Sequence, residues 1–267
     1  MTDESRPARR RALITGASRG IGAALARTAP SDMDLLLVGR DADALEAVAE
    51  AERSAGRSVD IHAVDIANPQ GRASLIEDAA DRIDVLVNNA GLGAWGDFLK
   101  VEPTAHEAAV AVNMAAPTAL MRGLLPGMIA RSRMMGRRGG LINMASSAAF
   151  APVPSFAVYA ASKAYLLSLT EALTAELRRE PIDVMTVCPG AVATEFGERA
   201  GFGGSIPGAM TPEHVASRSW AALGHRRTLV LGPVDKALFT PAALARATAA
   251  EVAARGAKLA GMFNGRR

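Results

Sequence analysis

A tyrosine and a lysine placed four residues apart, Tyr159 and Lys163, are the pair in this chain best suited to proton transfer. On a helix, that spacing brings both side chains to one face. A free phenol has a pKa of roughly 10, and a nearby ammonium favours the phenolate and moves that pKa toward neutral pH. Lysine is scarce here, at four of 30 basic residues. Taken alone, the pair is more simply explained as an exposed helical contact, so its meaning depends on the rest of the sequence.

The first apolar run ends in a glycine-rich turn, Thr15-Gly16-Ala17-Ser18-Arg19-Gly20-Ile21-Gly22. Glycines allow a tight turn and a close approach of the backbone to a ligand, and the helix that follows presents its N–H groups to a pyrophosphate. A plain tight connection is the alternative, but the place after the first strand favours a nucleotide site. The candidate cofactor contacts of this turn are Gly16, Ser18, Arg19, Gly20, Ile21 and Gly22.

Arg40 follows that turn by about 20 residues, where an acid would bind a ribose 2′-hydroxyl and an arginine would bind a 2′-phosphate. Arg19 can converge on the same phosphate. Each of them can also be an ordinary surface arginine, and the neighbouring Asp41 leaves NAD(H) as the alternative cofactor. The charge pattern favours NADP(H). Asp65 and Ile66 close the third apolar run and are placed to meet the adenine, although Asp65 also fits a helix N-cap.

Three later segments supply further candidate residues. The fourth apolar run ends in Asn88-Asn89-Ala90-Gly91, whose amides can tie neighbouring loops while the small residues leave room for a sugar. The fifth leads to Ser146, thirteen residues before Tyr159. The sixth ends in Pro189-Gly190-Ala191-Val192-Ala193-Thr194, a turn that can face a nicotinamide carboxamide. The candidate cofactor contacts here are Asn89, Ala90, Gly91, Pro189, Gly190, Val192 and Thr194, with Tyr159 and Lys163 beside them.

Short apolar runs alternate with longer helical patterns along the chain. Strands are predicted at 12–15, 34–39, 59–64, 85–88, 140–145, 184–188 and 228–231. Helices are predicted at 21–29, 41–55, 69–82, 104–131, 155–179 and 212–223. This alternation predicts an α/β fold, a Rossmann-type doubly wound parallel sheet of about seven strands with helices on both faces.

The remaining segments complete the predicted organisation of the chain. We expect a flexible N-terminal tail at 1–10 and a single nucleotide-binding domain at 11–267. Within that domain, 131–140 is predicted as a surface loop, 196–211 as a glycine-rich lid over the substrate, and 240–267 as a helical C-terminal extension that packs on the core or on a neighbouring subunit.

Composition argues against several other classes of protein. A net charge of +3 and an aromatic content of 4% do not suggest a nucleic-acid partner. No apolar run is long enough to predict a membrane span, and the acidic first residues do not resemble a signal peptide. The single cysteine, Cys188, fits a buried core residue in a cytoplasmic protein, the four histidines lack metal-ligand spacing, and no Gly-x-Ser-x-Gly hydrolase motif occurs.

The motifs occur together in a specific order: the glycine turn, Asn-Asn-Ala-Gly, Asn113, Ser146, Tyr159-x-x-x-Lys163 and Pro189-Gly190. In that order, and over about residues 10–235, the chain resembles the short-chain dehydrogenase/reductase (SDR) family. The segments Cys188-Pro189-Gly190 and Thr194-Glu195-Phe196 are similar to the branch labelled ketoacyl-reductase-like or DltE-like.

The resemblance implies an NADPH-dependent oxidoreductase that reduces a ketone or aldehyde, or catalyses the reverse oxidation. It implies that Tyr159 is the general acid, that Ser146 holds the carbonyl oxygen, and that Lys163 binds the nicotinamide ribose and lowers the pKa of Tyr159. Asn113 would anchor a water molecule between Lys163 and solvent. Outside the family pattern, Ser146 also fits a turn cap and Asn113 a satisfied polar core residue.

The sequence also leads to expectations about the substrate and the oligomeric state. The residues expected around the pocket are mostly apolar: Leu92, Trp95, Phe98, Phe150, Val153, Phe156, Phe196 and Phe202. They predict a hydrophobic carbonyl compound as substrate, such as an acyl, polyketide-like or steroid-like ketone. The family also implies a homodimer or homotetramer formed through the helices at 104–131 and 155–179. A non-catalytic NADP(H)-binding sensor or scaffold on the same fold is the alternative function.

Overall fold

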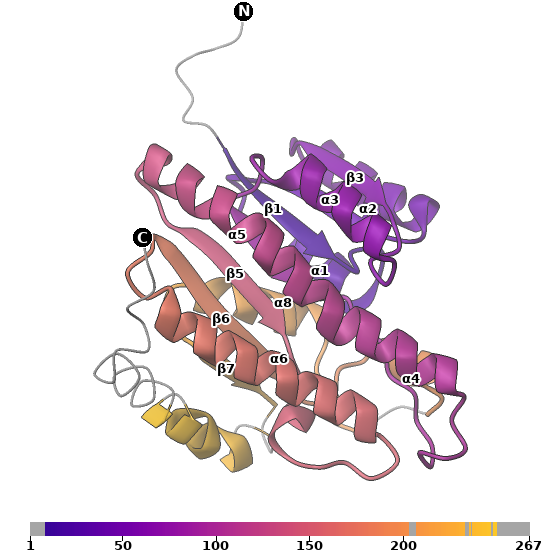
Figure 1. The fold of residues 1–267 in the computed structure, drawn as a ribbon. Coiled ribbons are helices and arrows are strands. Elements are labelled where there is room, and N and C mark those ends of the chain that lie inside the picture. The colour runs from indigo at the N-terminus through magenta and orange to yellow at the C-terminus, as the bar shows by residue number, and fades with distance from the viewer. Residues whose placement is uncertain (1–8, 203–206, 233–234, 236, 247, 250–267) are drawn as a thin grey trace, which may run out of the picture.

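The computed structural model describes residues 9–202, 207–232, 235, 237–246 and 248–249. Within them, seven parallel strands form one sheet in the order β3-β2-β1-β4-β5-β6-β7, so the predicted doubly wound α/β fold is confirmed (Figure 1). The strands are β1 (Arg10–Thr15), β2 (Met33–Gly39), β3 (Val59–Ala63), β4 (Val85–Asn88), β5 (Gly139–Met144), β6 (Ile182–Pro189) and β7 (Thr228–Leu231). The order reverses between β1 and β4, the switch point at which open α/β sheets bind ligands.

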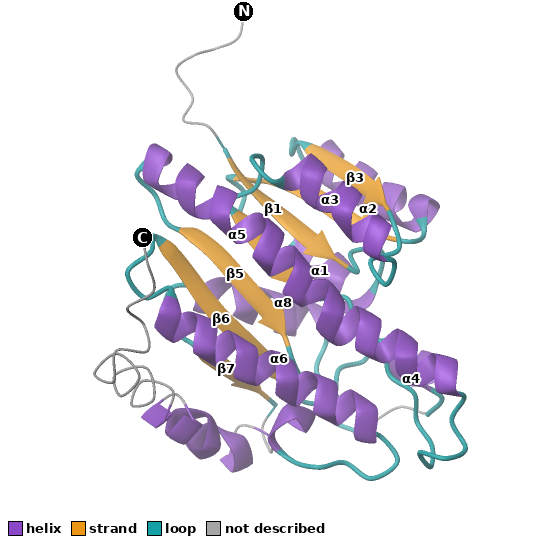
Figure 2. Cartoon of the chain, in the orientation of Figure 1, coloured by secondary structure: helices purple, strands orange, loops and turns teal. Residues whose placement is uncertain are grey.

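Helices cover both faces of this sheet (Figure 2). One face carries α1 (Gly20–Arg27), α2 (Ala42–Ser54) and α8 (Pro212–Ala222), and the other carries α3 (Pro69–Ala79), α5 (Ala116–Met135) and α6 (Ala157–Glu176). The central strands are apolar on both sides because both faces are covered. Leu13, Leu86 and Leu141 face α5, whereas Ile14, Val87 and Ile142 face the opposite layer.

The structure differs from the predicted organisation between α5 and β5 and at the start of β1. The segment 131–140 is not a surface loop, because α5 continues to Met135 and β5 begins at Gly139. Arg131 lies 3.0 Å from the buried carboxylate of Asp84, and the hydroxyl of Ser132 donates to the carbonyl of Met128, so this segment has partners that favour a helix. β1 begins at Arg10, the last residue of the expected N-terminal tail, and residues 1–8 of that tail lie outside the described residues.

A long helix precedes β5. It comprises α4 (Pro103–Val110), a π-helical turn η1 (Ala111–Ala115) and α5. The sequence showed no membrane span, yet the continuous helix Pro103–Met135 is long and apolar enough to cross a bilayer by composition. Half of its most apolar stretch is buried, and Leu120, Leu124 and Met128 are fully enclosed against the sheet. Packing on the sheet therefore accounts for its apolar face.

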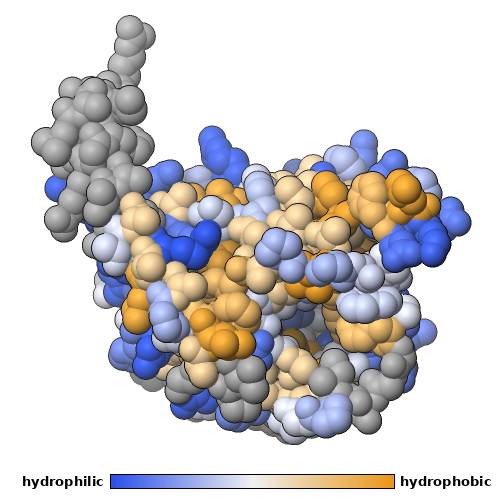
Figure 3. Space-filling model, turned by 90° about the horizontal axis from the view of Figure 1, so that it is seen from below, coloured by the Kyte–Doolittle hydropathy of each residue, from blue (hydrophilic) through white to orange (hydrophobic). Residues whose placement is uncertain are grey.

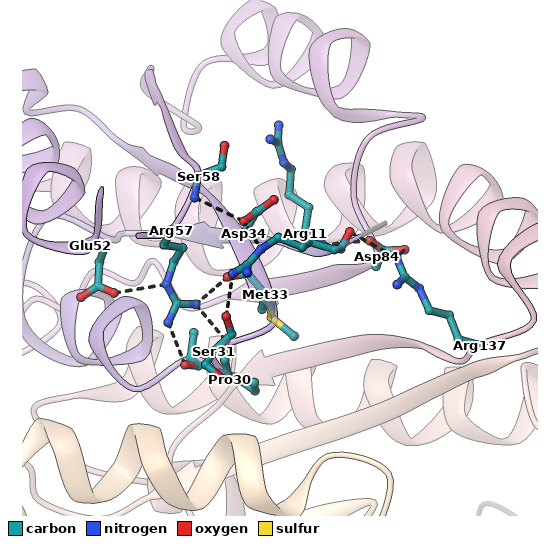
Figure 4. Close-up of polar contacts among 12 residues, drawn as sticks. Arg11, Pro30, Ser31, Met33, Asp34, Glu52, Arg57, Ser58, Asp84 and Arg137 are labelled. Carbon is teal, nitrogen blue, oxygen red and sulfur yellow. Dashed lines mark hydrogen bonds and ion pairs between the residues drawn. The ribbon is translucent and has the colours of Figure 1, made fainter. Parts of the chain in front are cut away.

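Ionic contacts hold the amino-terminal edge of the sheet (Figure 4). Arg57 lies 3.3 Å from Glu52 and donates to the carbonyls that follow α1, including those of Pro30 and Met33. Asp84 accepts from the backbone N–H of Arg11 at 2.8 Å. These charges have structural partners, and the candidate site lies at the opposite edge.

The last part of the chain packs against its own domain. The region 196–211 is not wholly a loop, because it begins with α7 (Phe196–Ala200), and residues 203–206 of the expected lid lie outside the described residues. The helical extension is described at 237–246, slightly earlier than expected, and 250–267 lie outside the description. Phe239 stacks on Phe150 with ring centroids 5.2 Å apart, and Arg246 lies 2.9 Å from Glu171 of α6.

Candidate active site

The glycine turn between β1 and α1 is packed so closely that side chains are excluded. Gly16 has a φ of 65°, and a Cβ there would lie 2.9 Å from Cα of Ala90. A Cβ on Gly22 would lie 2.0 Å from the carbonyl oxygen of Gly16. Glycine at these two positions therefore keeps the turn tight, as close approach of its backbone to a pyrophosphate requires.

Thr15 and Asn89 tie the end of β1 to the end of β4. The amide of Asn89 donates to the carbonyl of Thr15 at 2.9 Å, and the Thr15 hydroxyl accepts from the N–H groups of Asn89 and Ala90 at 3.0 and 3.1 Å. The predicted Asn89-Ala90-Gly91 segment therefore lies directly against the glycine turn.

The charged groups at the end of β2 separate into paired and unpaired ones. Arg19 lies 2.8 Å from Asp41 and 3.2 Å from Glu195. Asp41 also caps α2 by accepting from the N–H of Ala44 at 3.1 Å. Arg40 is exposed, and among the described residues it forms no ion pair. Asp41 is thus occupied, and Arg40 is available to a ligand.

Asp65 and Ile66 follow β3 as expected. Asp65 accepts from the N–H of Ala67 at 2.9 Å, so its side chain forms a local turn. The N-cap alternative for Asp65 was wrong, because Asn68 caps α3 by accepting from the N–H of Gln70.

Tyr159 and Lys163 lie on the first turns of α6, and their environment excludes an exposed helical contact. Lys163 is only 3% exposed, and its Nζ donates to the carbonyl of Met144 at 2.8 Å. The same Nζ lies 5.6 Å from the centroid of the Tyr159 ring. Ser146 forms a side-chain hydrogen bond with Tyr159 and also accepts from the N–H of Ala148 at 3.2 Å. The structure therefore brings Ser146, Tyr159 and Lys163 together.

Burial controls the protonation of this group. It raises the pKa of Tyr159 to about 12, although the hydrogen bond with Ser146 lowers it, and it lowers the pKa of Lys163 to about 8. The expected lowering of the Tyr159 pKa by Lys163 was wrong for this structure, because desolvation of the phenolate dominates. The phenol is protonated at neutral pH, as a general acid must be.

Cys188 lies directly behind this group and is fully buried. It accepts a hydrogen bond from the backbone N–H of Ser146, and burial raises the pKa of its thiol to about 12. The thiol stays neutral, so the interpretation of Cys188 as a core residue is confirmed.

Asn113 lies in the π-helical turn and is 1% exposed. Its side chain accepts from the N–H of Leu92 at 2.8 Å, and it donates to the carbonyl of Leu92 at 2.8 Å and to the hydroxyl of Ser162 at 2.9 Å. A Cβ on Gly91 would lie 3.2 Å from Nζ of Lys163 and 3.5 Å from Oδ1 of Asn113. Asn113 is thus a satisfied polar core residue that also borders the space beside Lys163. π-helical turns often occur at functional sites.

The segment after β6 completes the arrangement. Val192 pairs with Met210 in an isolated bridge, and a Cβ on Gly20 would lie 3.3 Å from Thr194. The N–H of Gly190 donates to the carbonyl of Leu231 at 2.9 Å. Thr194 therefore lies against the glycine turn, on the same edge of the sheet as Tyr159.

The family model described as short chain dehydrogenase matches residues 10–201. The chain belongs to the short-chain dehydrogenase/reductase (SDR) family. Such enzymes are NAD(P)-dependent oxidoreductases that act on small molecules.

Known SDR proteins resemble the chain over most of its length. A ketoacyl reductase of a Nostoc species is 32% identical over 85% of this chain and 80% of its own. A short-chain dehydrogenase from Sphingobium yanoikuyae, solved in complex with NADPH, is 31% identical with a TM-score of 0.78 over 97% of both chains. A bulky-bulky ketone specific alcohol dehydrogenase from Comamonas testosteroni is 27% identical with a TM-score of 0.75, over 91% of this chain and 94% of the other.

Aromatic rings gather around Tyr159 in this SDR protein. Phe156 and Phe196 lie 4.3 and 5.3 Å from its ring, centroid to centroid, and Trp95 and Phe202 pack against Phe156 at 5.5 and 5.6 Å. In the view onto the carboxyl ends of the strands, hydrophobic side chains border a hollow in the surface (Figure 3). Phe98 and Phe150 are not members of this ring cluster, because Phe98 stacks on His106 and Phe150 stacks on Phe239.

Sequence reasoning did not single out Thr15 and Ser162 of this SDR site. Ser162 is fully buried, accepts from Asn113 and donates to the carbonyl of Tyr159 at 2.7 Å. Both residues were visible as polar members of the two motifs, Thr15 before the glycine turn and Ser162 between Tyr159 and Lys163. Among the described residues, no group of three or more His, Cys, Asp or Glu side chains could hold a metal ion.

Proposed function

We propose that this SDR enzyme uses NADPH to reduce the carbonyl group of a hydrophobic ketone or aldehyde, and that it can also catalyse the reverse oxidation of the alcohol. The observation that carries the proposal is the protonated phenol of Tyr159, hydrogen-bonded to Ser146 and enclosed by aromatic rings beside Lys163. A phenol kept neutral can give its proton to an oxygen that gains negative charge.

The glycine-lined turn fits a dinucleotide. Side chains at Gly16 and Gly22 would collide with the backbone of Ala90 and of Gly16, so only glycine lets this turn close into the tight form that binds a pyrophosphate. When bound, the reduced nicotinamide supplies the hydride. Gly16, Ser18, Gly20 and Ile21 would hold the pyrophosphate, and Lys163 would donate to the ribose hydroxyls.

A preference for NADP(H) over NAD(H) follows from the charges at the end of β2. A ribose 2′-hydroxyl needs a free acid there, but Asp41 is engaged by Arg19 and by the cap of α2. The exposed Arg40 suits a 2′-phosphate, and Arg19 can join it by exchanging its carboxylate partners for the phosphate. The NADPH bound to the Sphingobium relative supports this preference.

Tyr159 and Ser146 would divide the proton chemistry between them. The phenol of Tyr159 transfers its proton to the carbonyl oxygen, and the hydroxyl of Ser146 holds that oxygen in place. Asn113 holds the backbone of Leu92 and, with Gly91, borders the space next to Lys163, so a water molecule there can return a proton through the lysine.

A hydrophobic substrate suits the rings around Tyr159. The names of two relatives, a ketoacyl reductase and a bulky-bulky ketone specific alcohol dehydrogenase, agree with a large ketone as substrate.

We also propose that the protein is cytoplasmic and forms a homodimer or homotetramer that associates through the helices at 104–131 and 155–179.

The test compares NADPH consumption by the wild type, Tyr159→Phe and Tyr165→Phe over a panel of ketones. Tyr159→Phe should lower kcat by about 10²–10⁴-fold while NADPH still binds, because only the proton donor is lost. Tyr165 bonds to Thr118 at 2.8 Å on another side of α6, so its variant should keep most of the activity. A wild type that binds NADPH but reduces nothing would favour the sensor or scaffold function instead.

A further inference from the structure

Phe156 covers the ring of Tyr159. Their planes are nearly parallel, at 18°, with centroids 4.3 Å apart, and Phe156 is only 7% exposed. Phe156 immediately precedes α6, so one face of the phenol is shielded by a residue that is three positions earlier in the chain.

The backbone before Phe156 holds an unusual conformation. Ser155 has a φ of 60°, and it is the non-glycine residue with a positive φ among the described residues. Its carbonyl accepts from the N–H of Gly96 at 2.9 Å. A left-handed residue that lacks the freedom of glycine is maintained only when its surroundings hold it. The chain therefore holds Phe156 against Tyr159 at the expense of an unfavourable backbone conformation at Ser155.

The ring of Phe156 is also enclosed on its other sides. A Cβ on Gly93 would lie 2.7 Å from Cζ of Phe156 and 3.0 Å from Cζ of Phe196. Trp95 is tilted by 57° and Phe202 by 80° against Phe156, so ring edges surround it. Trp95 in turn is tied to α7, because its N–H donates to the carbonyl of Ala200 at 2.7 Å.

We propose that Phe156 fixes the ring plane of Tyr159 and holds in place the partly exposed rings around it, which form the wall that selects carbonyl compounds carrying a flat aromatic substituent. These rings are Trp95, Phe196 and Phe202. The selectivity part rests on the proposed reductase function. Rings that meet at tilted angles favour another ring as their neighbour, because aromatic pairs prefer edge-to-face and offset contacts. Aliphatic side chains in the same positions would give no such preference. Phe156 is thus a positioning residue for Tyr159 and for the rings of the substrate wall.

A spectroscopic test needs no substrate. The chain has two tyrosines, so protein labelled with [¹³C]tyrosine gives two ring signals, and Tyr165→Phe assigns them. In the parent, the Tyr159 signal should not titrate below pH 11, since burial holds its pKa at about 12. Phe156→Leu should lower the midpoint by about one unit because water reaches the phenol. Phe98→Leu should leave it unchanged, because Phe98 stacks on His106 and is not part of the ring cluster around Phe156.

A kinetic test measures selectivity. The ratio of kcat/KM for aryl ketones to that for aliphatic ketones of similar size should fall about tenfold in Phe156→Leu. Phe98→Leu is the matched control, because Phe98 is 59% exposed and stacks on His106 away from Tyr159. Phe156→Met serves as a second apolar variant if the leucine variant does not fold.

An unchanged Tyr159 midpoint in both apolar variants would overturn the positioning role. An unchanged ketone ratio, or an equal change in Phe98→Leu, would overturn the selectivity role. A parent that reduces no carbonyl compound would instead remove the proposed function and the selectivity that rests on it, whereas the tyrosine titration would still decide how Phe156 acts on Tyr159.

Discussion

The Nζ atom of Lys163 lies 2.8 Å from the carbonyl oxygen of Met144, so the lysine is fastened to the end of the strand that leads into Ser146. One hydrogen bond thus joins α6 to β5 at the point where both enter the active site. The lysine is nevertheless almost fully enclosed, and burial lowers its pKa to about 8.

Lys163 should make stability rise with pH in an alkaline window. Its pKa is 10.5 in the unfolded chain and about 8 in the folded protein, so between these values the unfolded state binds more protons. Lys163→Met removes this rise. In urea denaturation from pH 7 to 10, the free energy of unfolding of the wild type should rise relative to that of the variant above pH 8. The rise should reach up to about 1.4 kcal/mol per pH unit. Burial raises the pKa of Tyr159 and Cys188, which opposes this trend in both proteins alike. Parallel stability curves would contradict the prediction.

Gly22→Ala should damage the nucleotide site. The added methyl group would lie 2.0 Å from the carbonyl oxygen of Gly16, which is too close for any small adjustment. We expect a loss of about 2 kcal/mol or more in thermal unfolding, and weaker NADPH binding by fluorescence. Gly39→Ala is the control, because its methyl group would sit 3.4 Å from the flexible end of Leu45. Equal effects of the two substitutions would argue against a steric role for Gly22.

Arg40→Ala should reduce the preference for NADPH. Hydrogen bonds to charged groups contribute about 1.5–3 kcal/mol, so the ratio of kcat/KM for NADPH to that for NADH should fall at least tenfold or so. Arg53→Ala provides the comparison, since Arg53 pairs with Glu46 on the far part of α2. If the ratio is the same in both variants, Arg40 does not read the 2′-phosphate.

Asn113→Ala should cost more stability than an ordinary buried polar deletion. It leaves the N–H and carbonyl of Leu92 without their partners, which amounts to about 2–4 kcal/mol. Ser219→Ala on α8 removes one buried hydroxyl that donates to the carbonyl of Val215 in its own helix, so its effect should be about 1 kcal/mol or less. Chemical denaturation of the two variants compares these costs directly. Equal losses would mean that Asn113 is not what holds Leu92.

Much of the fold was readable in the sequence because the central strands are apolar on both faces and each ends in a polar or glycine-rich motif. β4 and β7 were predicted at their observed bounds, Val85–Asn88 and Thr228–Leu231. The glycine turn was equally clear, since it depends on backbone space that only glycine leaves.

Other features depend on contacts between distant segments. Arg19 meets Glu195, and Arg131 meets Asp84, across long stretches of chain, so neither pairing could be read locally. The π-helical turn at Asn113 is fixed by Leu92, which sequence spacing does not reveal. The left-handed Ser155 carries no signal either, because its residue type does not favour that conformation. The rise in the Tyr159 pKa also follows from tertiary burial rather than from its neighbour Lys163.

The stacked pair of Phe150 and Phe239 links the C-terminal helix to the 3₁₀ turn η2 (Ser147–Phe150) that directly follows Ser146. A substitution at position 239 can thus shift the hydroxyl of Ser146 without touching a ligand. Directed evolution confined to residues around the substrate would miss this route, whereas random mutagenesis of the whole gene would sample it. Engineering of turnover in this enzyme should therefore include the helix at 237–246 among its targets.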